Sequence, residues 1–351
     1  MLVLGIDAHK RTHTVVVFDE AGRKLGQHTT TSATTADHLE LVRWADRFGA
    51  DRRWAVEDCR HLSRRLERDL LTAGEAIVRV PPKMMAHARD AARTYGKSDP
   101  IDALAVARAA LREPDLPAAR LDDETRQVRL LVDHREDLIG ERTRQINRLR
   151  WHLHELDPAW DPPQRSLNRY KQLDEIIARL ADFDGLVARL ALELTTSVRD
   201  LTVRINNLER EITVLVKALA PTLLTRPGIG VLTAAKLLGE TADITRFRNK
   251  DAYARHTGTA PLPVWSGNRT RHRLARTGNR QLNCAIHRIA VTQGRCHPDA
   301  RAFIARRIAR DNTPSEARRA LKRRLSDLVY RDLLHDASIA APHPLSAGGL
   351  T

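Results

Sequence analysis

The feature that most constrains the fold is a long apolar repeat in the middle of the chain. Between Leu173 and Leu219, apolar residues stand at positions 173, 176, 180, 183, 187, 190, 194, 198, 201, 205, 208, 212, 215 and 219. The mean step of about 3.5 residues is the repeat of helices that pack along a seam. At about 1.5 Å per residue, a helix of this length would extend roughly 70 Å, which exceeds the width of a small domain. The chain is therefore not expected to form a single globule.

A second helix is predicted before this one. Apolar residues recur with helical spacing from Val128 to Leu156, and Pro158, Pro162 and Pro163 separate the two helices. The prolines predict an antiparallel hairpin or a jointed arm. Because so long a helix needs a partner along its seam, we expect a homodimer held by this coiled-coil segment. The alternative is a helical hairpin within one chain.

The first part of the chain has a different pattern. Short β-rich runs are separated first by turns and then by amphipathic helices at Thr35–Phe48 and Leu62–Ala73. The runs predicted to be strands are Leu2–Asp7, His13–Phe18, Lys24–Thr30, Trp54–Glu57 and Ala76–Val80, and further helices are expected to about Leu111. Three strands in a meander, followed by alternating helices and strands, predict an α/β layer structure. This order is that of the ribonuclease H-like fold.

Four acidic residues stand at positions where this fold would bring them together. Asp7 and Glu57 end two predicted strands, while Asp99 and Asp102 lie in the first turn of a predicted helix. The spacing of three residues places the two aspartates on one helical face. Strand alternation directs Asp58 away from Glu57, so Glu57 is the expected ligand. Carboxylate oxygens are ligands for Mg²⁺, and a pair of such ions can act on a phosphodiester.

The charge of the chain suggests a polyanionic partner. The formal net charge is +15, and the segment 226–331 alone carries 23 Lys and Arg against 7 Asp and Glu. A localised basic surplus of this size favours nucleic acid, whereas an arginine-rich but inert surface is the plainer alternative. The cations expected to contact nucleic acid are Arg269, Arg271, Arg273, Arg276, Arg280, Arg306 and Arg307. Those at 306 and 307 belong to a basic run at 301–324 that is predicted to form two helices.

Other features exclude further classes. No apolar run is long enough to cross a membrane, and the first residues lack the pattern of a secretory signal. Three scattered cysteines do not make a disulfide framework or a zinc cluster. We therefore expect a cytoplasmic protein with no membrane partner.

Several motifs together resemble one family of mobile elements, the insertion-sequence one-ten family of DEDD transposases. In the first part the resemblance lies in Gly5-Ile6-Asp7, Val56-Glu57 and Lys97-Ser98-Asp99-x-x-Asp102-Ala103. In the second part it lies in Arg226–Gly230, Thr233–Glu240, Phe247–Gly258, Ser266-Gly267 and Thr277–Arg280. Two departures are visible: Cys59-Arg60-His61 replaces a Gly-x-Tyr that follows the acidic strand end in many members, and His9 stands where the family usually has a small or apolar residue.

The resemblance implies a RuvC-like DEDD catalytic domain at 1–120, a helical coiled-coil segment at 121–222 and a mainly α transposase domain at 223–335. It also implies a recombinase that holds Mg²⁺ on the four carboxylates and attacks DNA through a serine, which by motif position is Ser266. The expected partners are donor DNA, target DNA, a structured bridge RNA from the element and further copies of the chain, as a dimer or as a tetramer on DNA. The remaining residues, 336–351, are rich in Ala, Pro and Gly, and we expect them to be disordered.

Two other functions stay open on the sequence. The chain could be a metal-dependent RuvC-like nuclease or Holliday-junction resolvase in which Ser266 plays no part. It could also be a binding protein with a degenerate site, although an intact set of four carboxylates argues against this.

Overall fold

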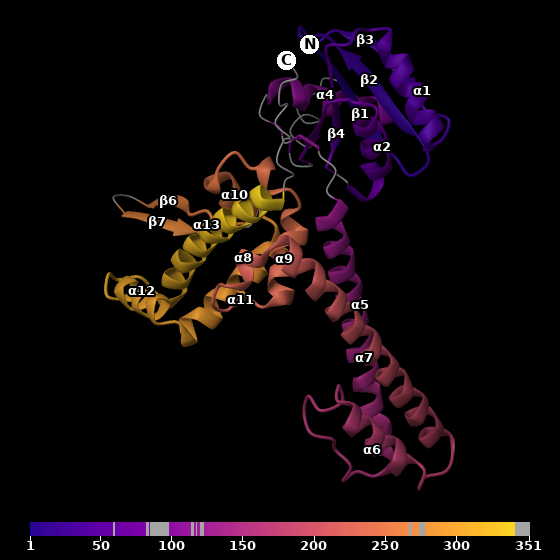
Figure 1. Ribbon diagram of the computed structural model, residues 1–351, viewed down its shortest axis with the longest axis vertical. Helices are drawn as coiled ribbons and strands as arrows, with labels where there is room; N and C mark the ends of the chain where they lie inside the picture. Colours follow the sequence, from indigo (N-terminus) through magenta and orange to yellow (C-terminus); the bar gives the residue numbers. More distant parts are fainter. Residues whose placement is uncertain are drawn as a thin grey trace, which may run out of the picture. The chain divides into compact units, whose positions relative to one another are not determined.

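The computed structural model describes residues 1–58, 60–81, 84, 98–113, 116, 118–119, 123–266, 269–273 and 278–340. The chain divides into two compact units, residues 1–121 and 122–351. Figure 1 shows a sheet with helices in the first unit and a largely helical second unit. The α/β sheet expected near the N-terminus and the mostly helical remainder are thus confirmed.

A five-stranded sheet forms the centre of the first unit, in the order β3-β2-β1-β4-β5. The strands are β1 (Leu2–Ala8), β2 (His13–Phe18), β3 (Lys24–Thr29), β4 (Arg52–Glu57) and β5 (Ile77–Val80). The first three strands pair antiparallel, and β4 and β5 then run parallel to β1. All five strands lie where the sequence predicted them.

Helices cover both faces of this sheet. On one face, α1 (Thr35–Asp46) and α2 (Arg60–Thr72) contribute Leu41 and Leu66 to a core with alternate residues of the strands, such as Ile6 and Val56. On the other face, α4 (Asp99–Arg112) packs an almost pure alanine and valine surface against the remaining alternate residues. Because strand side chains alternate between faces, residues with odd numbers in β1 and β4 point towards α4.

Gly5 determines how closely α4 approaches the sheet. A Cβ atom on Gly5 would lie 2.2 Å from the carbonyl oxygen of Ala103 and 2.6 Å from the backbone nitrogen of Ala107. Only glycine leaves space for the helix backbone at this distance. The close approach brings the first turn of α4 next to the end of β1, two residues after Gly5.

The second unit begins with a helical arm. Helix α5 (Asp123–Leu156) packs against α7 (Leu186–Leu219), with Leu138, Leu201 and Ile205 buried between them. An ion pair of 2.7 Å between Arg135 and Glu209 also joins the two helices. Within one chain, therefore, the seam is occupied by the intramolecular hairpin that the sequence left open as an alternative to the dimer.

The apolar repeat from Leu173 to Leu219 does not form one continuous helix, contrary to the prediction. It is divided into α6 (Tyr170–Leu180) and α7, and the break ends at Gly185, whose φ of 95° is unfavourable for residues with a side chain. Helix α6 folds back over the end of the arm, where Trp160 stacks on Phe183 and is buried with Ile176. With 34 residues, α7 extends about 50 Å and not 70 Å.

The base of the arm and the C-terminal helices share one hydrophobic core. Val132 of α5 and Val216 of α7 are buried together with Leu237, Ile286 and Val329 of the later helices. These helices are α8 (Pro221–Leu224), α9 (Val231–Thr241), η1 (Ile244–Arg246), α10 (Lys250–His256), α11 (Arg280–Cys296), α12 (Pro298–Ile308) and α13 (Pro314–Ala340). A hairpin of β6 (Leu262–Ser266) and β7 (Arg269–Arg273) lies between α10 and α11 in the chain. The two helices predicted in the basic run at 301–324 are α12 and the first part of α13.

The last helix extends further than the sequence predicted. Residues 336–340, which were expected to begin a disordered tail, continue α13, and Asp336 is 3% exposed. Its carboxylate accepts hydrogen bonds from the backbone nitrogen and the hydroxyl of Thr222 at the start of α8. This buried contact fixes the end of the helix; positions 341–351 lie outside the described residues. Among the helices described, none combines the length and apolar character needed to cross a membrane.

Replacing Gly5 by alanine should test the close contact with α4. Because the new methyl group has no space, we expect a loss of about 1–3 kcal/mol in the free energy of unfolding of the sheet. Hydrogen exchange of the β1 amides, followed by mass spectrometry, measures this locally. Gly140→Ala is the matched control, since its Cβ would meet only the Arg144 side chain at an ordinary 3.6 Å. Unchanged protection of β1 in Gly5→Ala would contradict the packing argument.

Candidate active site

Asp7 lies near the end of β1 on the face covered by α4. It follows Gly5 by two residues, pairs across the sheet with Thr14, and is only 8% exposed. Its Oδ2 atom is buried and has no hydrogen-bond partner among the described residues. A buried carboxylate oxygen is costly unless a positive charge lies beside it, and the Nε2 atom of His9 lies 3.0 Å from this oxygen.

Glu57 is the last residue of β4, the strand that pairs with β1. The parallel register pairs Ile6 with Val56, so Asp7 and Glu57 follow at the same edge of the sheet. Ala55, two residues earlier, belongs to the core under α4, and alternation therefore places Glu57 on the α4 face and Asp58 on the other. Of the two neighbouring acids, Glu57 is therefore the one on the same face of the sheet as Asp7.

Asp99 and Asp102 lie in the first turn of α4, with Ser98 at the N-cap position and Pro100 among the first helical residues. Asp102 is 6% exposed, whereas the Asp99 side chain is about half exposed. A proline without an amide hydrogen is tolerated at this position, and the positive end of the helix dipole favours carboxylates. The local sequence thus explains why two acids can begin this helix.

The carboxylates influence one another electrostatically. Burial raises the pKa of Asp7 above its usual value, and the nearby Asp102 and Asp99 raise it further, whereas His9 lowers it. Negative groups that are held this close are destabilised unless a cation lies between them. The donor set of carboxylate oxygens and the unpartnered Oδ2 of Asp7 fit a divalent ion such as Mg²⁺. The residues that could hold it are Asp7, Glu57, Asp99 and Asp102.

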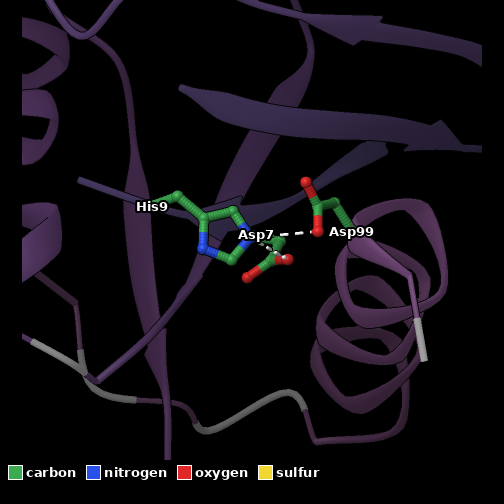
Figure 2. Close-up of side chains that lie close together, drawn as sticks. All are labelled: Asp7, His9 and Asp99. Atoms are coloured by element: carbon green, nitrogen blue, oxygen red, sulfur yellow. Dashed lines mark ion pairs between the residues drawn. The ribbon is translucent and has the colours of Figure 1, made fainter. Parts of the chain in front are cut away.

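One residue close to the acids, His9, was not predicted from the sequence as part of the site. His9 follows β1, and its Nε2 atom lies 3.0 Å from Oδ2 of Asp7 and 3.2 Å from Oδ1 of Asp99. Figure 2 shows the imidazole directed between the two carboxylates. The signal that could have identified it is the Asp7-x-His9 spacing, which places both side chains on one side of an extended chain.

Ser266 belongs to the second unit, where its backbone is part of a short β-hairpin. It is the last residue of β6 and pairs with Arg269, the first residue of β7, so it ends a strand and does not lie in an irregular loop. Arg269, Arg271 and Arg273 occupy alternate positions of β7. Arg276 lies outside the described residues, as do Gly267 and Asn268 between the strands.

The Thr-Gly-Asn-Arg motif after this hairpin has a clear structural role. A Cβ on Gly278 would lie 2.2 Å from the backbone nitrogen of Gly258, so two backbone segments touch here. Asn279 caps α11 by accepting hydrogen bonds from the amides of Gln281 and Leu282, and its side-chain amide donates to Glu240 at 2.7 Å. The motif thus fixes the chain where it returns from the hairpin into α11.

The other arginines predicted to contact nucleic acid lie on helices α11 and α12. Arg280 begins α11 and is exposed. Arg306 and Arg307 lie in the last turn of α12, where Arg306 is exposed and the Arg307 guanidinium lies 5.8 Å from the centre of the Phe303 ring. Exposed arginines are suitable for contacts with phosphates.

Two family models match the sequence of the chain. A DEDD transposase model of the IS110 type matches residues 4–158, and the model described as transposase of the IS116/IS110/IS902 family matches residues 220–305. The chain belongs to the IS110 family of insertion-element transposases. It is therefore a DNA transposase, and DNA is its substrate. The resemblance inferred from the motifs is confirmed.

Relatives in other insertion elements match nearly the whole length of this transposase. One is the "uncharacterized 44.8 kDa protein" of element IS116 from Streptomyces clavuligerus, which is 28% identical over 97% of this chain and 96% of the relative. Another is the "uncharacterized 42 kDa protein" of IS900 from Mycobacterium paratuberculosis, 26% identical over 98% of both chains. A third, from IS110 of Streptomyces coelicolor, is 29% identical over 74% of this chain and 76% of the relative.

A solved structure also shares some similarity with the transposase. This is RuvC of T. thermophilus, described as a complex with a Holliday junction substrate, and 95% of it aligns with 32% of this chain. The identity is 17% and the TM-score is 0.26, which is too low to equate the two folds.

Glu57 and Asp58 offer a matched pair for testing the acidic site. Because alternation places Glu57 on the α4 face, at the strand end next to Asp7, Glu57→Gln should lower divalent-metal-dependent DNA cleavage by about a hundredfold or more. Asp58→Asn changes a neighbouring charge on the opposite face and should retain most of the activity. Cleavage of a labelled element-end substrate measures both rates, and circular dichroism checks the fold. Similar losses in the two variants would exclude a specific role for Glu57.

Proposed function

We propose that this transposase cuts and rejoins DNA strands at the ends of an insertion element, with divalent ions held by Asp7, Glu57, Asp99 and Asp102 and with Ser266 as the nucleophile. The observation that carries the metal part is the crowding of Asp99 and Asp102 around the buried carboxylate of Asp7, whose Oδ2 atom makes no hydrogen bond of good geometry within the described residues. The observation that favours a nucleophile in the second unit is the match of residues 220–305 to the transposase family.

The first unit has the features of a ribonuclease H-like, RuvC-like catalytic domain. Its strand order β3-β2-β1-β4-β5, with β1 central and three antiparallel strands before two parallel ones, supports this interpretation. The acids lie at the ends of the central strands and at the start of the helix that crosses them. The location suits polyanionic DNA, because the acids lie where β1 and β4 end and α4 begins, and the side chains of Asp99 and His9 are about half exposed there.

Two Mg²⁺ ions are the proposed cofactors, since hard cations prefer carboxylate oxygens and a metal pair can stabilise the attacking and leaving oxygens of a phosphodiester. Asp7 and Asp102, both nearly buried, would hold an ion in a fixed place. The more exposed Asp99 and the strand end at Glu57 would complete the set of ligands. These four side chains would thus supply fixed ligand positions and negative charge for the ions.

Ser266 would act through a covalent intermediate. Attack of its hydroxyl oxygen on phosphorus forms a serine–DNA phosphodiester and releases the sugar hydroxyl of the other end, while the serine proton passes to a base. Attack by a hydroxyl of a second strand then releases the serine and joins the strands. The number of phosphodiester bonds is conserved, which suits recombination better than hydrolysis.

The surrounding cations and helices suggest the partners. Arg269, Arg271, Arg273, Arg276, Arg280, Arg306 and Arg307 are proposed to contact donor DNA, target DNA or a structured bridge RNA. The large basic surplus of residues 226–331 supports a polyanionic partner on this unit. On the arm, Trp151, Leu186 and Val214 remain 60–74% exposed although α5 and α7 pack together. Such residues support dimerisation through the coiled-coil arm.

A metal-dependent RuvC-like nuclease or Holliday-junction resolvase remains the second candidate. The same carboxylates could direct water at the phosphodiester, and Ser266 would then have no chemical role. The two functions differ in one product, because only the serine mechanism leaves protein joined to a DNA end.

Ser266→Ala should form no covalent adduct with cleaved DNA and should not recombine. Incubation with a radiolabelled element-end substrate, followed by a denaturing gel, detects protein joined to a labelled strand. Ser338→Ala is the matched control, because Ser338 is an exposed serine near the end of α13. It should form the adduct normally. Recombination by Ser266→Ala would show that the serine mechanism is wrong, and metal-dependent cleavage without any adduct in the native protein would favour the resolvase.

Replacement of Arg280 and Arg306 by alanine should weaken DNA binding in a salt-dependent way. Log affinity falls as log salt rises, and each phosphate contact that is lost makes this negative slope less steep by about 0.9. Fluorescence anisotropy with a labelled duplex at several salt concentrations gives this slope. The control is Arg189→Ala, since Arg189 on the arm is exposed and paired with Glu193 at 2.9 Å. If the native protein, the variant without Arg280 and Arg306, and Arg189→Ala all gave the same slope, contacts of Arg280 and Arg306 with phosphates would be contradicted.

A further inference from the structure

We infer that His9 is a direct ligand of one of the two proposed divalent ions, the one bound by Asp7 and Asp99, and that this nitrogen ligand makes that one position bind Mn²⁺ more tightly than the Mg²⁺ proposed above. The inference rests on the proposed metal role of the carboxylates. It adds a ligand outside the four acids and an ion preference that an all-oxygen site would not have.

The three side chains converge on one small volume. One ligand atom from each of Asp7, His9 and Asp99 lies within 4.8 Å of the other two. The Nε2 atom of His9 is 3.0 Å from Asp7 Oδ2 and 3.2 Å from Asp99 Oδ1. Ligands at about 2.1 Å from one ion lie roughly 3 Å apart when they are at right angles. These distances therefore match neighbouring ligands of a single ion (Figure 2).

The hydrogen bonding of these atoms points the same way. Although Asp7 Oδ2 and His9 Nε2 are close, both atoms are buried and neither has a hydrogen-bond partner in the described part of the chain. The imidazole and carboxylate are thus near each other but not aligned as donor and acceptor. Two buried polar atoms that lack aligned hydrogen bonds destabilise the fold, and a cation bound to both atoms would remove this cost.

The backbone holds the imidazole in this position. The amide of His9 donates to the carbonyl of Thr12 at 3.0 Å, which closes the turn between β1 and β2. The His9 side chain as a whole is 45% exposed, so the ring edge faces solvent while Nε2 is directed inwards. An ion could therefore reach the ligand atoms from solvent without displacement of the sheet or of α4.

The nitrogen ligand determines the ion preference. Mg²⁺ binds oxygen ligands almost exclusively, whereas Mn²⁺, a first-row transition ion that also takes carboxylate oxygens, accepts an imidazole nitrogen more readily than Mg²⁺ does. A set of two carboxylates and one imidazole is therefore better matched to Mn²⁺ than to Mg²⁺. Two other roles for His9 are distinguishable from this one: a charged partner of the carboxylates would hold them without bonding to the ion, and a proton donor or acceptor would leave metal affinity unchanged.

The experiment uses the full chain and the metal alone, without DNA. Electron spin-echo envelope modulation of bound Mn²⁺ detects a directly bonded imidazole nitrogen, and titration calorimetry gives the affinities for Mn²⁺ and Mg²⁺. We expect nitrogen modulation in the native protein and its loss in His9→Ala. The affinity for Mn²⁺ should fall by about tenfold or more, with a much smaller change for Mg²⁺.

His28→Ala serves as the matched control, because His28 lies in β3 of the same sheet, stacks on Trp44 of α1, and is not part of the cluster of Asp7, His9 and Asp99. It should retain both the modulation and the preference for Mn²⁺. Asp7→Asn tests the underlying site. If Mn²⁺ binds in an Asp7-dependent way but shows no nitrogen modulation, the inference about His9 is wrong and the acidic site stands. If Asp7→Asn leaves metal binding unchanged, the proposed metal site itself is wrong.

Discussion

The contact between α4 and Gly5 is the constraint on which the acidic site depends. The backbone of the helix lies against β1 where a methyl group would come within 2.2 Å of Ala103. Because Asp7 follows two residues later on the same face, the first turn of α4 is brought to the end of β1. Small residues along α4, such as Ala103, Val106 and Ala107, allow this approach over several turns. A larger residue at Gly5 would move Asp99 and Asp102 away from Asp7.

Close packing of this kind also creates an electrostatic cost at the site. It buries Asp7 beside two other acids, and the pKa of Asp7 rises as a result. The chain places His9 against the same carboxylates, yet without an aligned hydrogen bond. The arrangement is therefore best satisfied by a bound cation. In the second unit, glycine again permits a close backbone contact, between Gly278 just before α11 and Gly258 just after α10.

Much of the first unit could be predicted from local pattern. Strands such as His13–Phe18 are β-branched and bounded by turns, and Asp7, Glu57, Asp99 and Asp102 stand at predicted element ends. The arm was less accurately predicted. Its apolar repeat continues through Phe183, but the backbone at Gly185 does not, and a heptad pattern carries no information on a break that a turn imposes. The burial of Asp336 was missed because its partner, Thr222, is remote in sequence.

By itself the sequence determined the order of strands and helices in the first unit, the family, and the positions of the four acids proposed as ligands, because periodicity and motif spacing are local properties. Only the tertiary structure decided that His9 joins the acids and that α5 and α7 pair within one chain. Each of these depends on contacts between segments that are distant in sequence or on the direction of a side chain after a turn. Spacing along the chain does not specify such contacts, since they arise only when the hydrophobic faces pack.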